Sequence, residues 1–120
     1  MRAARIDNNQ NQIVSMLRDY PHITVSITSA CGNGFPDIVV GYEGLSFLFE
    51  IKDTGKRRKL TDAEILFRRG WTGHYDVIES VDEILELIGY DNTLNEEELL
   101  IMDEFKKEFL YTKSEKRAPE

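Results

Sequence analysis

The feature that most constrains this fold is a pair of β-type segments separated by only two residues. Residues 37–42 (DIVVGY) and 45–52 (LSFLFEIK) are rich in β-branched and aromatic residues, and Glu43-Gly44 lies between them. This pattern predicts a β-hairpin. A two-residue turn pairs Tyr42 with Leu45, and continuing that register places Asp37 opposite Glu50.

The predicted hairpin has two faces of different character, because side chains alternate along a strand. One face is uniformly apolar and consists of Ile38, Val40, Tyr42, Phe47, Phe49 and Ile51. We expect it to be the core face, covered by the helices predicted at 61–69 and 80–88. The other face carries Asp37, Val39, Leu48, Glu50 and Lys52.

Two carboxylates facing each other across a hairpin indicate a cation site. Like charges on opposed strand residues are destabilising, and a cation between Asp37 and Glu50 removes the repulsion. Mg²⁺ is typically held by one or two carboxylates together with substrate phosphate, and the backbone carbonyl of Ile51 offers a further oxygen. Lys52 can orient a water molecule or stabilise charge on the phosphate. The pattern therefore predicts metal-dependent phosphodiester hydrolysis, with Asp37, Glu50 and Lys52 as catalytic residues.

The same residues also allow a plainer interpretation. Glu-Gly is a poorer two-residue turn than Asn-Gly, and a three-residue loop would shift the pairing by one residue. Asp37 would then lie near the end of the strand pair and could still reach the metal after a local bulge. In the plainest interpretation, Glu50 and Lys52 form an exposed ion pair on a strand and Asp37 is a turn residue.

The rest of the chain predicts helices and strands around this hairpin. A helix at 9–20 ends before Pro21, a strand spans 22–29, and a glycine-rich loop spans 32–36. Thr61 and Glu64 form a capping box that opens a helix to about Arg69. A strand at 75–79 and a helix from 80 to about 88, again with a capping-box start, follow. Trp71 and Tyr75 are expected in the core.

The order α-β-β-β-α-β-α predicts an α/β fold with a mixed sheet flanked by helices. Residues 1–90 are expected to form the core. Residues 91–120 are expected to form an acidic helical extension, packed on the core or on a second subunit. In this extension Asn95 is the expected cap, and the expected apolar stripe is Leu99, Met102, Phe105 and Phe109.

Charge is distributed unevenly along the chain. The net charge is −7, but residues 1–75 carry ten Lys and Arg against eight Asp and Glu, whereas residues 76–120 carry five against fourteen. The first part therefore still allows a basic surface. The chain has no apolar run long enough to span a membrane, no apolar centre of a signal peptide, and a single cysteine, Cys31. We expect a soluble cytoplasmic protein without a membrane partner.

Two short motifs resemble the signature of the PD-(D/E)xK nucleases. They are Gly34-Phe35-Pro36-Asp37 and Phe49-Glu50-Ile51-Lys52, followed by the Lys-Leu-Thr helix start at residues 59–61. The resemblance covers roughly residues 8–88 and is closest to the VRR-NUC and Holliday-junction-resolvase-like branch, common in bacteriophages. It implies a restriction-endonuclease-like core that cleaves DNA with Mg²⁺ or Mn²⁺. It also favours branched or flapped DNA and a homodimer, in the host cytoplasm if the protein is phage-encoded.

The chain departs from the resembled pattern at two positions. Many relatives carry a glutamate on the first helix, where this chain offers Gln10 and Gln12. VRR-NUC relatives often carry a glutamine on the helix after the Glu-x-Lys strand, where this chain has Glu64. Glu64 is either only a helix cap or a third acidic group at the site. Candidate nucleic-acid contacts are Ser29, Asn33, Lys56, Arg57, Arg58 and Lys59.

Two further functions remain open from the sequence. The absent first-helix glutamate allows a catalytically weak nucleic-acid-binding module of the same fold. The acidic C-terminal third allows an interaction or inhibitor protein that mimics nucleic acid and binds a basic partner.

Overall fold

The predicted order of helices and strands is confirmed by the structure, a computed structural model. It describes residues 8–91, 97–98, 100–101, 103–105 and 107–108. The elements are α1 (Asn8–Leu17), β1 (Thr24–Ile27), a 3₁₀ turn (Ser29–Cys31), β2 (Ile38–Tyr42), β3 (Leu45–Ile51), α2 (Asp62–Gly70), β4 (Tyr75–Ile78) and α3 (Val81–Ile88). The protein is thus a mixed α/β fold. The first helix and the first strand are shorter than predicted, because turns at Asp19 and Tyr20 end the helix and begin the connection to β1.

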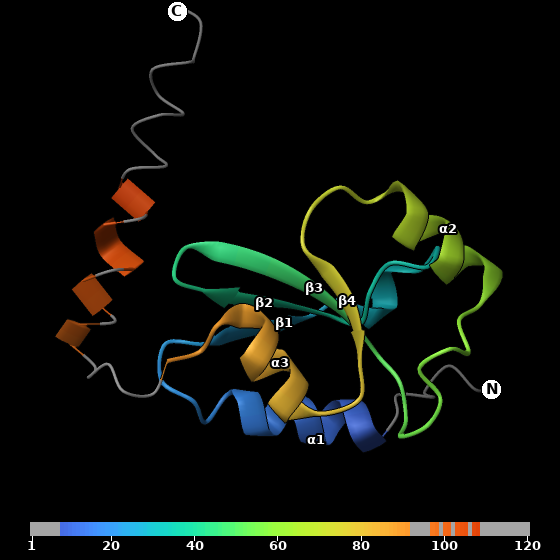
Figure 1. Ribbon diagram of the computed structural model, residues 1–120, viewed down its shortest axis with the longest axis horizontal. Helices are drawn as coiled ribbons and strands as arrows, with labels where there is room; N and C mark the ends of the chain where they lie inside the picture. The colour runs from blue at the N-terminus through green and yellow to red at the C-terminus, as the bar shows by residue number, and fades with distance from the viewer. Residues whose placement is uncertain (1–7, 92–96, 99, 102, 106, 109–120) are drawn as a thin grey trace, which may run out of the picture.

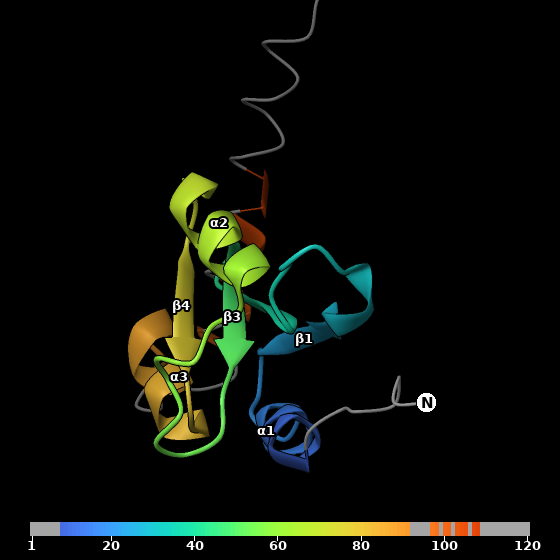
Figure 2. The ribbon, with the colours of Figure 1, turned by 90° about the vertical axis from the view of Figure 1, so that its right-hand side faces the viewer.

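The four strands form one mixed sheet in the order β1-β2-β3-β4. The β1–β2 and β2–β3 pairs are antiparallel, whereas β3 and β4 are parallel. A parallel pair requires a crossover connection, and α2 lies in this crossover. In Figure 1, α1 and α3 lie together below the sheet while α2 lies beyond its upper side; Figure 2 shows the same separation.

The hairpin turn sets the register of β2 and β3. Glu43 has φ 53° and Gly44 has φ 81°, and two positive φ angles are what a two-residue type I′ turn requires. The pairs run from Tyr42↔Leu45 to Ile38↔Phe49. The two-residue register is therefore confirmed, and the three-residue alternative is wrong.

The apolar face of the hairpin forms the core, as predicted. All six of its side chains are buried, and Ile38 and Val40 are fully inaccessible. The helices contribute two apolar stripes that pack against this face: Ile13, Val14 and Leu17 from α1, and Val81, Ile84 and Ile88 from α3. Burial of each such side chain stabilises the fold by about 1.5–3 kcal/mol.

The prediction that the helix after Thr61 also covers the core face is wrong. No residue of α2 is fully buried. Since α1 and α3 already bury the apolar face, α2 lies against the glycine-rich loop: Phe67 contacts Phe35 and Tyr75. Trp71, expected in the core, is 42% exposed at the end of this helix. Tyr75 is partly buried.

The described residues between 97 and 108 are helical. Phe105 is 67% exposed, and Leu100 and Ile101 are also exposed. The other predictions for this segment, the Asn95 cap and the apolar residues Leu99, Met102 and Phe109, lie outside the described residues. Across the described ranges, every helix is too short or too polar to cross a membrane.

Gly34 determines how closely α2 approaches the glycine-rich loop. Its φ is +79°, and a Cβ there would lie 2.3 Å from the carbonyl oxygen of Ala63. Gly55 has a similar φ of +83°, but a Cβ at that position would meet no heavy atom within 4 Å. We expect Gly55→Ala to lower the free energy of unfolding by about 1–2 kcal/mol, the cost of a left-handed residue. Gly34→Ala is expected to lower the free energy of unfolding by about 2–5 kcal/mol, because overpacking against Ala63 adds to the cost of the left-handed conformation.

Urea unfolding of the two variants beside the wild type measures this difference. Equal destabilisation by the two alanines would contradict the close contact between residue 34 and the backbone of α2.

Candidate active site

Asp37 is held against the end of β3 by two hydrogen bonds. Its backbone N–H donates to the Phe49 carbonyl oxygen at 3.0 Å. Its carboxylate Oδ2 accepts from the Ile51 N–H at 2.8 Å. The backbone of Thr28 also donates to the Asp37 carbonyl, at 2.8 Å. These contacts fix the carboxylate at the end of the strand pair, beside the backbone of β3.

Glu50 is a buried carboxyl group rather than part of an exposed ion pair. It lies on β3 between β2 and β4 and is 4% exposed. Burial, followed by the neighbouring charge of Asp37, raises the pKa of Glu50 to about 9. Burial also raises the pKa of Asp37, although its hydrogen bonds to Ile51 and Glu50 oppose this effect. The pKa of each carboxyl group is therefore raised above its ordinary value, because burial and the neighbouring carboxylate both disfavour the charged form.

Lys52 lies between two carboxylates. Its Nζ is 3.4 Å from Glu50 Oε2 and 3.0 Å from Glu64 Oε1. Burial lowers the pKa of Lys52, but the hydrogen bond to Glu64 and the charge of Glu50 outweigh it, so the pKa is raised overall. Lys52 is therefore a fixed cation at the edge of the carboxyl pair.

Glu64 forms the predicted helix cap, and its carboxylate also contacts Lys52; its replacement of the first-helix carboxylate stays a prediction. Its Oε1 accepts from the Thr61 N–H at 2.9 Å, and Thr61 Oγ1 accepts from the Glu64 N–H at 3.2 Å, so the predicted capping box is confirmed. Burial raises the pKa of Glu64, but the hydrogen bonds to Thr61 and Lys52 lower it overall. The start of α2 thus positions an ionised carboxylate on Lys52.

Asp37 and Glu50 together offer a minimal donor set for a divalent ion. Among the residues that the structure describes, no group of three or more His, Cys, Asp or Glu side chains is arranged to hold a metal ion. Two carboxylates still suit Mg²⁺, which usually keeps several waters and takes substrate phosphate oxygens as further ligands. Asp37 and Glu50 are therefore the residues that would hold such an ion, with substrate oxygens as further ligands.

The two glutamines of α1 lie in different surroundings. Gln10 is buried, and its Nε2 donates to Ser29 Oγ at 3.4 Å. Ser29 follows Thr28, whose backbone contacts Asp37. Gln12 is exposed and lines a groove with Met16 and the start of α3. Residues two apart on a helix do not face the same side, so the structure places Gln10 near the loop that flanks Asp37 and directs Gln12 elsewhere.

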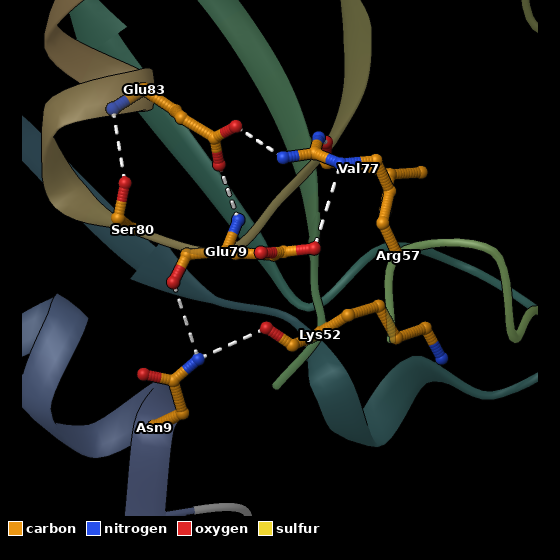
Figure 3. Close-up of polar contacts among 7 residues, drawn as sticks. All are labelled: Asn9, Lys52, Arg57, Val77, Glu79, Ser80 and Glu83. Carbon is orange, nitrogen blue, oxygen red and sulfur yellow. Dashed lines mark hydrogen bonds and ion pairs between the residues drawn. The ribbon is translucent and has the colours of Figure 1, made fainter. Parts of the chain in front are cut away.

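The basic run at 56–59 is divided between structural and exposed residues. Arg57 contacts the Val77 carbonyl oxygen and the Glu83 carboxylate, and lies 3.6 Å from Glu79 Oε2. Figure 3 shows its guanidinium turned toward the start of α3. Lys56, Arg58 and Lys59 are exposed, as is Asn33. Of the predicted nucleic-acid contacts in this run, Arg57 is therefore already engaged within the protein.

Asn9 is a positioning residue that the sequence did not reveal. Its Nδ2 donates to the Lys52 carbonyl oxygen at 3.0 Å and to the Glu79 carbonyl oxygen at 3.5 Å, as Figure 3 shows. The sequence around Asn9 indicates only a helix cap. Because Asn9 contacts the ends of β3 and β4, α1 helps to fix the backbone of Lys52.

The start of α3 differs slightly from the predicted capping box. Ser80 Oγ accepts from the Glu83 N–H at 3.4 Å, as expected for an N-cap. The Glu83 carboxylate, however, accepts from the Glu79 N–H at 2.6 Å and not from Ser80. Its second oxygen is thereby free to bind Arg57, which links the basic run to α3.

Asp37, Glu50, Lys52 and Glu64 thus form one cluster on the face of the sheet opposite the core. Comparison with known proteins adds no relative to this description: no protein-family model matches the chain, and no curated protein or solved structure is significantly similar to it.

Proposed function

We propose that this protein is a metal-dependent endodeoxyribonuclease with a restriction-endonuclease-like core of the PD-(D/E)xK type. The observation that carries the proposal is the hairpin register, which brings Asp37 and Glu50 together with Lys52 beside them. The mixed four-stranded sheet and the element order α-β-β-β-α-β-α give it further support.

The proposed mechanism assigns a separate role to each residue. Asp37 and Glu50 would hold Mg²⁺ or Mn²⁺, with the Ile51 carbonyl as a further oxygen. The bound ion would polarise a phosphoryl oxygen and lower the pKa of a water molecule. Lys52 stays protonated, so it would stabilise the charge that develops on the phosphate instead of accepting a proton. Glu64 would hold the ammonium group of Lys52 in place.

A non-catalytic DNA-binding module of the same fold is the second candidate. One observation favours it: the described residues supply two carboxylates for a metal, and a buried glutamine, Gln10, stands on α1 where many of the resembled nucleases have glutamate. Such a module would bind DNA without cleaving it.

A cleavage assay separates these functions. We expect the protein to nick or cut DNA with Mg²⁺ or Mn²⁺ and to be inactive in EDTA, with four-way junctions and flaps cut faster than linear duplex. Asp37→Asn is the inactive control. DNA binding without cleavage in either metal would favour the binding module. The absence of DNA binding at low salt, together with tight binding to a basic protein, would favour the acidic mimic.

We also propose that the protein is a homodimer, which would suit recognition of a branched substrate with two strands to cut. The exposed side chains of Leu100, Ile101 and Phe105 offer an apolar surface for the contact. Light scattering is expected to give twice the mass of one chain, and Phe105→Ser is expected to shift the protein toward monomer. A monomeric mass for the wild type at working concentration would contradict the dimer.

A further inference from the structure

Trp71 is the exposed end of an aromatic cluster that consists of Phe35, Phe67, Trp71 and Tyr75. Phe67 lies at its centre, with ring centroids 5.2 Å from Phe35, 5.2 Å from Trp71 and 5.9 Å from Tyr75. The Phe67 and Trp71 rings are stacked at an interplanar angle of 18°. One face of the indole is thus supported by Phe67, while 42% of the residue remains accessible. The result is a rigid aromatic surface at the end of α2.

The aromatic cluster adjoins the proposed active site. Phe35 is two residues before Asp37, and Tyr75 pairs with Leu48 on the same strand as Glu50. Burial, followed by the charge of Glu50, raises the pKa of Tyr75 to about 12. The aromatic cluster and the carboxyl groups therefore lie close together on the side of the sheet away from the core.

A cavity of about 360 Å³ lies beside the same helix. Its lining consists of Arg57, Arg58, Leu60, Ile65, Arg68, Asp76 and Val77. Arg57 is paired with Glu79 and Glu83. Arg58 and Arg68 are exposed, and neither has an ion pair with another residue in the described part of the chain. Asp76 is the only acidic side chain of the lining, so the two exposed arginines offer the cavity guanidinium groups that can take a phosphate.

Arg68 connects this cavity to Trp71. The two residues are three positions apart, and Trp71, which caps the end of α2 with an extended backbone, still donates its N–H to the Phe67 carbonyl oxygen at 3.1 Å. Residues three apart lie on neighbouring parts of one helix face. An aromatic surface and unpaired guanidinium groups thus lie next to each other.

We propose that Trp71, Arg58 and Arg68 bind an unpaired strand of the DNA substrate. A base stacks on the accessible part of the Trp71 indole, and the arginines contact the phosphates. Aromatic stacking beside a basic groove is the chemistry of single-strand binding, since every base has a π-face to offer. In a duplex the neighbouring pairs cover those faces. The substrate class that follows is DNA with a single-stranded segment, and the choice of DNA rests on the proposed function.

The test is a binding titration of the full chain in EDTA, where no cleavage occurs. Trp71 is the only tryptophan, so its fluorescence reports directly on stacking. We expect an oligothymidylate of about 12 nucleotides to quench this fluorescence. The same strand annealed to its complement is expected to bind at least about tenfold more weakly and to quench less.

Variants separate stacking from charge, with affinity measured by the anisotropy of a labelled strand. Trp71→Leu keeps an apolar side chain against Phe67 but has no aromatic face, and it is expected to lower affinity by about fivefold or more. Arg68→Gln is expected to lower affinity and to reduce the slope of log affinity against log salt by about 0.7. Arg69→Gln makes the same charge change one residue further on, outside the cavity lining, and is expected to have a much smaller effect.

The outcomes distinguish this inference from the nuclease proposal. If Trp71→Leu, folded as judged by circular dichroism, binds the single strand as tightly as the wild type, the inference is overturned. Equal affinity for single strand and duplex without quenching also overturns it, even if the metal-dependent cleavage assay succeeds. Quenching of the Trp71 fluorescence by the single strand, together with weaker binding of the labelled strand by Trp71→Leu and Arg68→Gln, supports the inference, even if no metal brings about cleavage.

Discussion

Lys52→Met is expected to lower the rate of metal-dependent DNA cleavage by about 10²–10³-fold, the usual cost of removing one group that stabilises transition-state charge. Lys52 is held by Glu50 at 3.4 Å and Glu64 at 3.0 Å, and no water needs to reorganise around it as charge develops on the phosphate. Methionine keeps most of the side-chain length and removes the charge. The measurement is single-turnover cleavage of a labelled flap substrate at saturating protein.

The matched control is Lys56→Met, because Lys56 is an exposed lysine only four residues further along the chain. It is expected to weaken DNA binding slightly and to leave the saturated cleavage rate within about threefold of the wild type. Circular dichroism and a thermal melt verify that both variants are folded. If Lys52→Met cleaved DNA at the wild-type rate, Lys52 would not be a catalytic residue.

Glu50→Gln is expected to stabilise the protein, and to do so more strongly as the pH rises. The pKa of Glu50 is raised to about 9 in the folded protein, mainly by burial, whereas in the unfolded chain it is near its ordinary value of 4.5. Between these values the folded state keeps a proton that the unfolded state has lost. The free energy of unfolding of the wild type therefore falls as the pH rises through this range, by at most about 1.4 kcal/mol per pH unit. Glutamine has no proton to lose, so the stabilisation of Glu50→Gln relative to the wild type increases over the same pH range.

Glu64→Gln is the control with the opposite sign. The pKa of Glu64 is lowered in the folded protein, because its hydrogen bonds to Thr61 and Lys52 outweigh the effect of burial. The stability that this carboxylate contributes is present above its ordinary pKa and is lost as the pH falls through the lowered value. Glu64→Gln is therefore expected to destabilise the protein at neutral pH. Urea unfolding at pH 5, 7 and 9 measures both variants, and a Glu50→Gln effect that does not change with pH would contradict the raised pKa.

Mg²⁺ adds a second measurement to the same comparison. An ion that binds only the folded state stabilises it by about 1.4 kcal/mol at ten times its dissociation constant. We expect Mg²⁺ to raise the free energy of unfolding of the wild type and to have little effect on Glu50→Gln. Equal stabilisation of the two would place the metal away from Glu50.

The strand pair at the centre of the site could be predicted from local sequence alone. Residues 38–42 and 45–51 alternate between the two faces, and a two-residue turn at Glu43-Gly44 leaves a single register that buries every apolar side chain of the core face. Asp37 and Glu50 are brought together by that register, and Lys52 follows on the same face. The Thr61–Glu64 capping box is equally local, because its two hydrogen bonds join residues three apart.

The surroundings of the site depended on tertiary packing. The apolar pattern of α2 does not predict which face of the sheet this helix covers. Its position on the face opposite the core leaves Trp71 exposed and brings Glu64 to Lys52. Likewise, the sequence shows Arg57 as one of four basic residues in a row, but only the approach of α3 pairs it with Glu83. The sequence by itself determined the hairpin, and with a two-residue turn also its register and the carboxyl pair, since the alternation of side chains along two adjacent strands defines them. Only the tertiary structure decided which charges are paired and which rings stay exposed, because those contacts join segments that no local pattern relates.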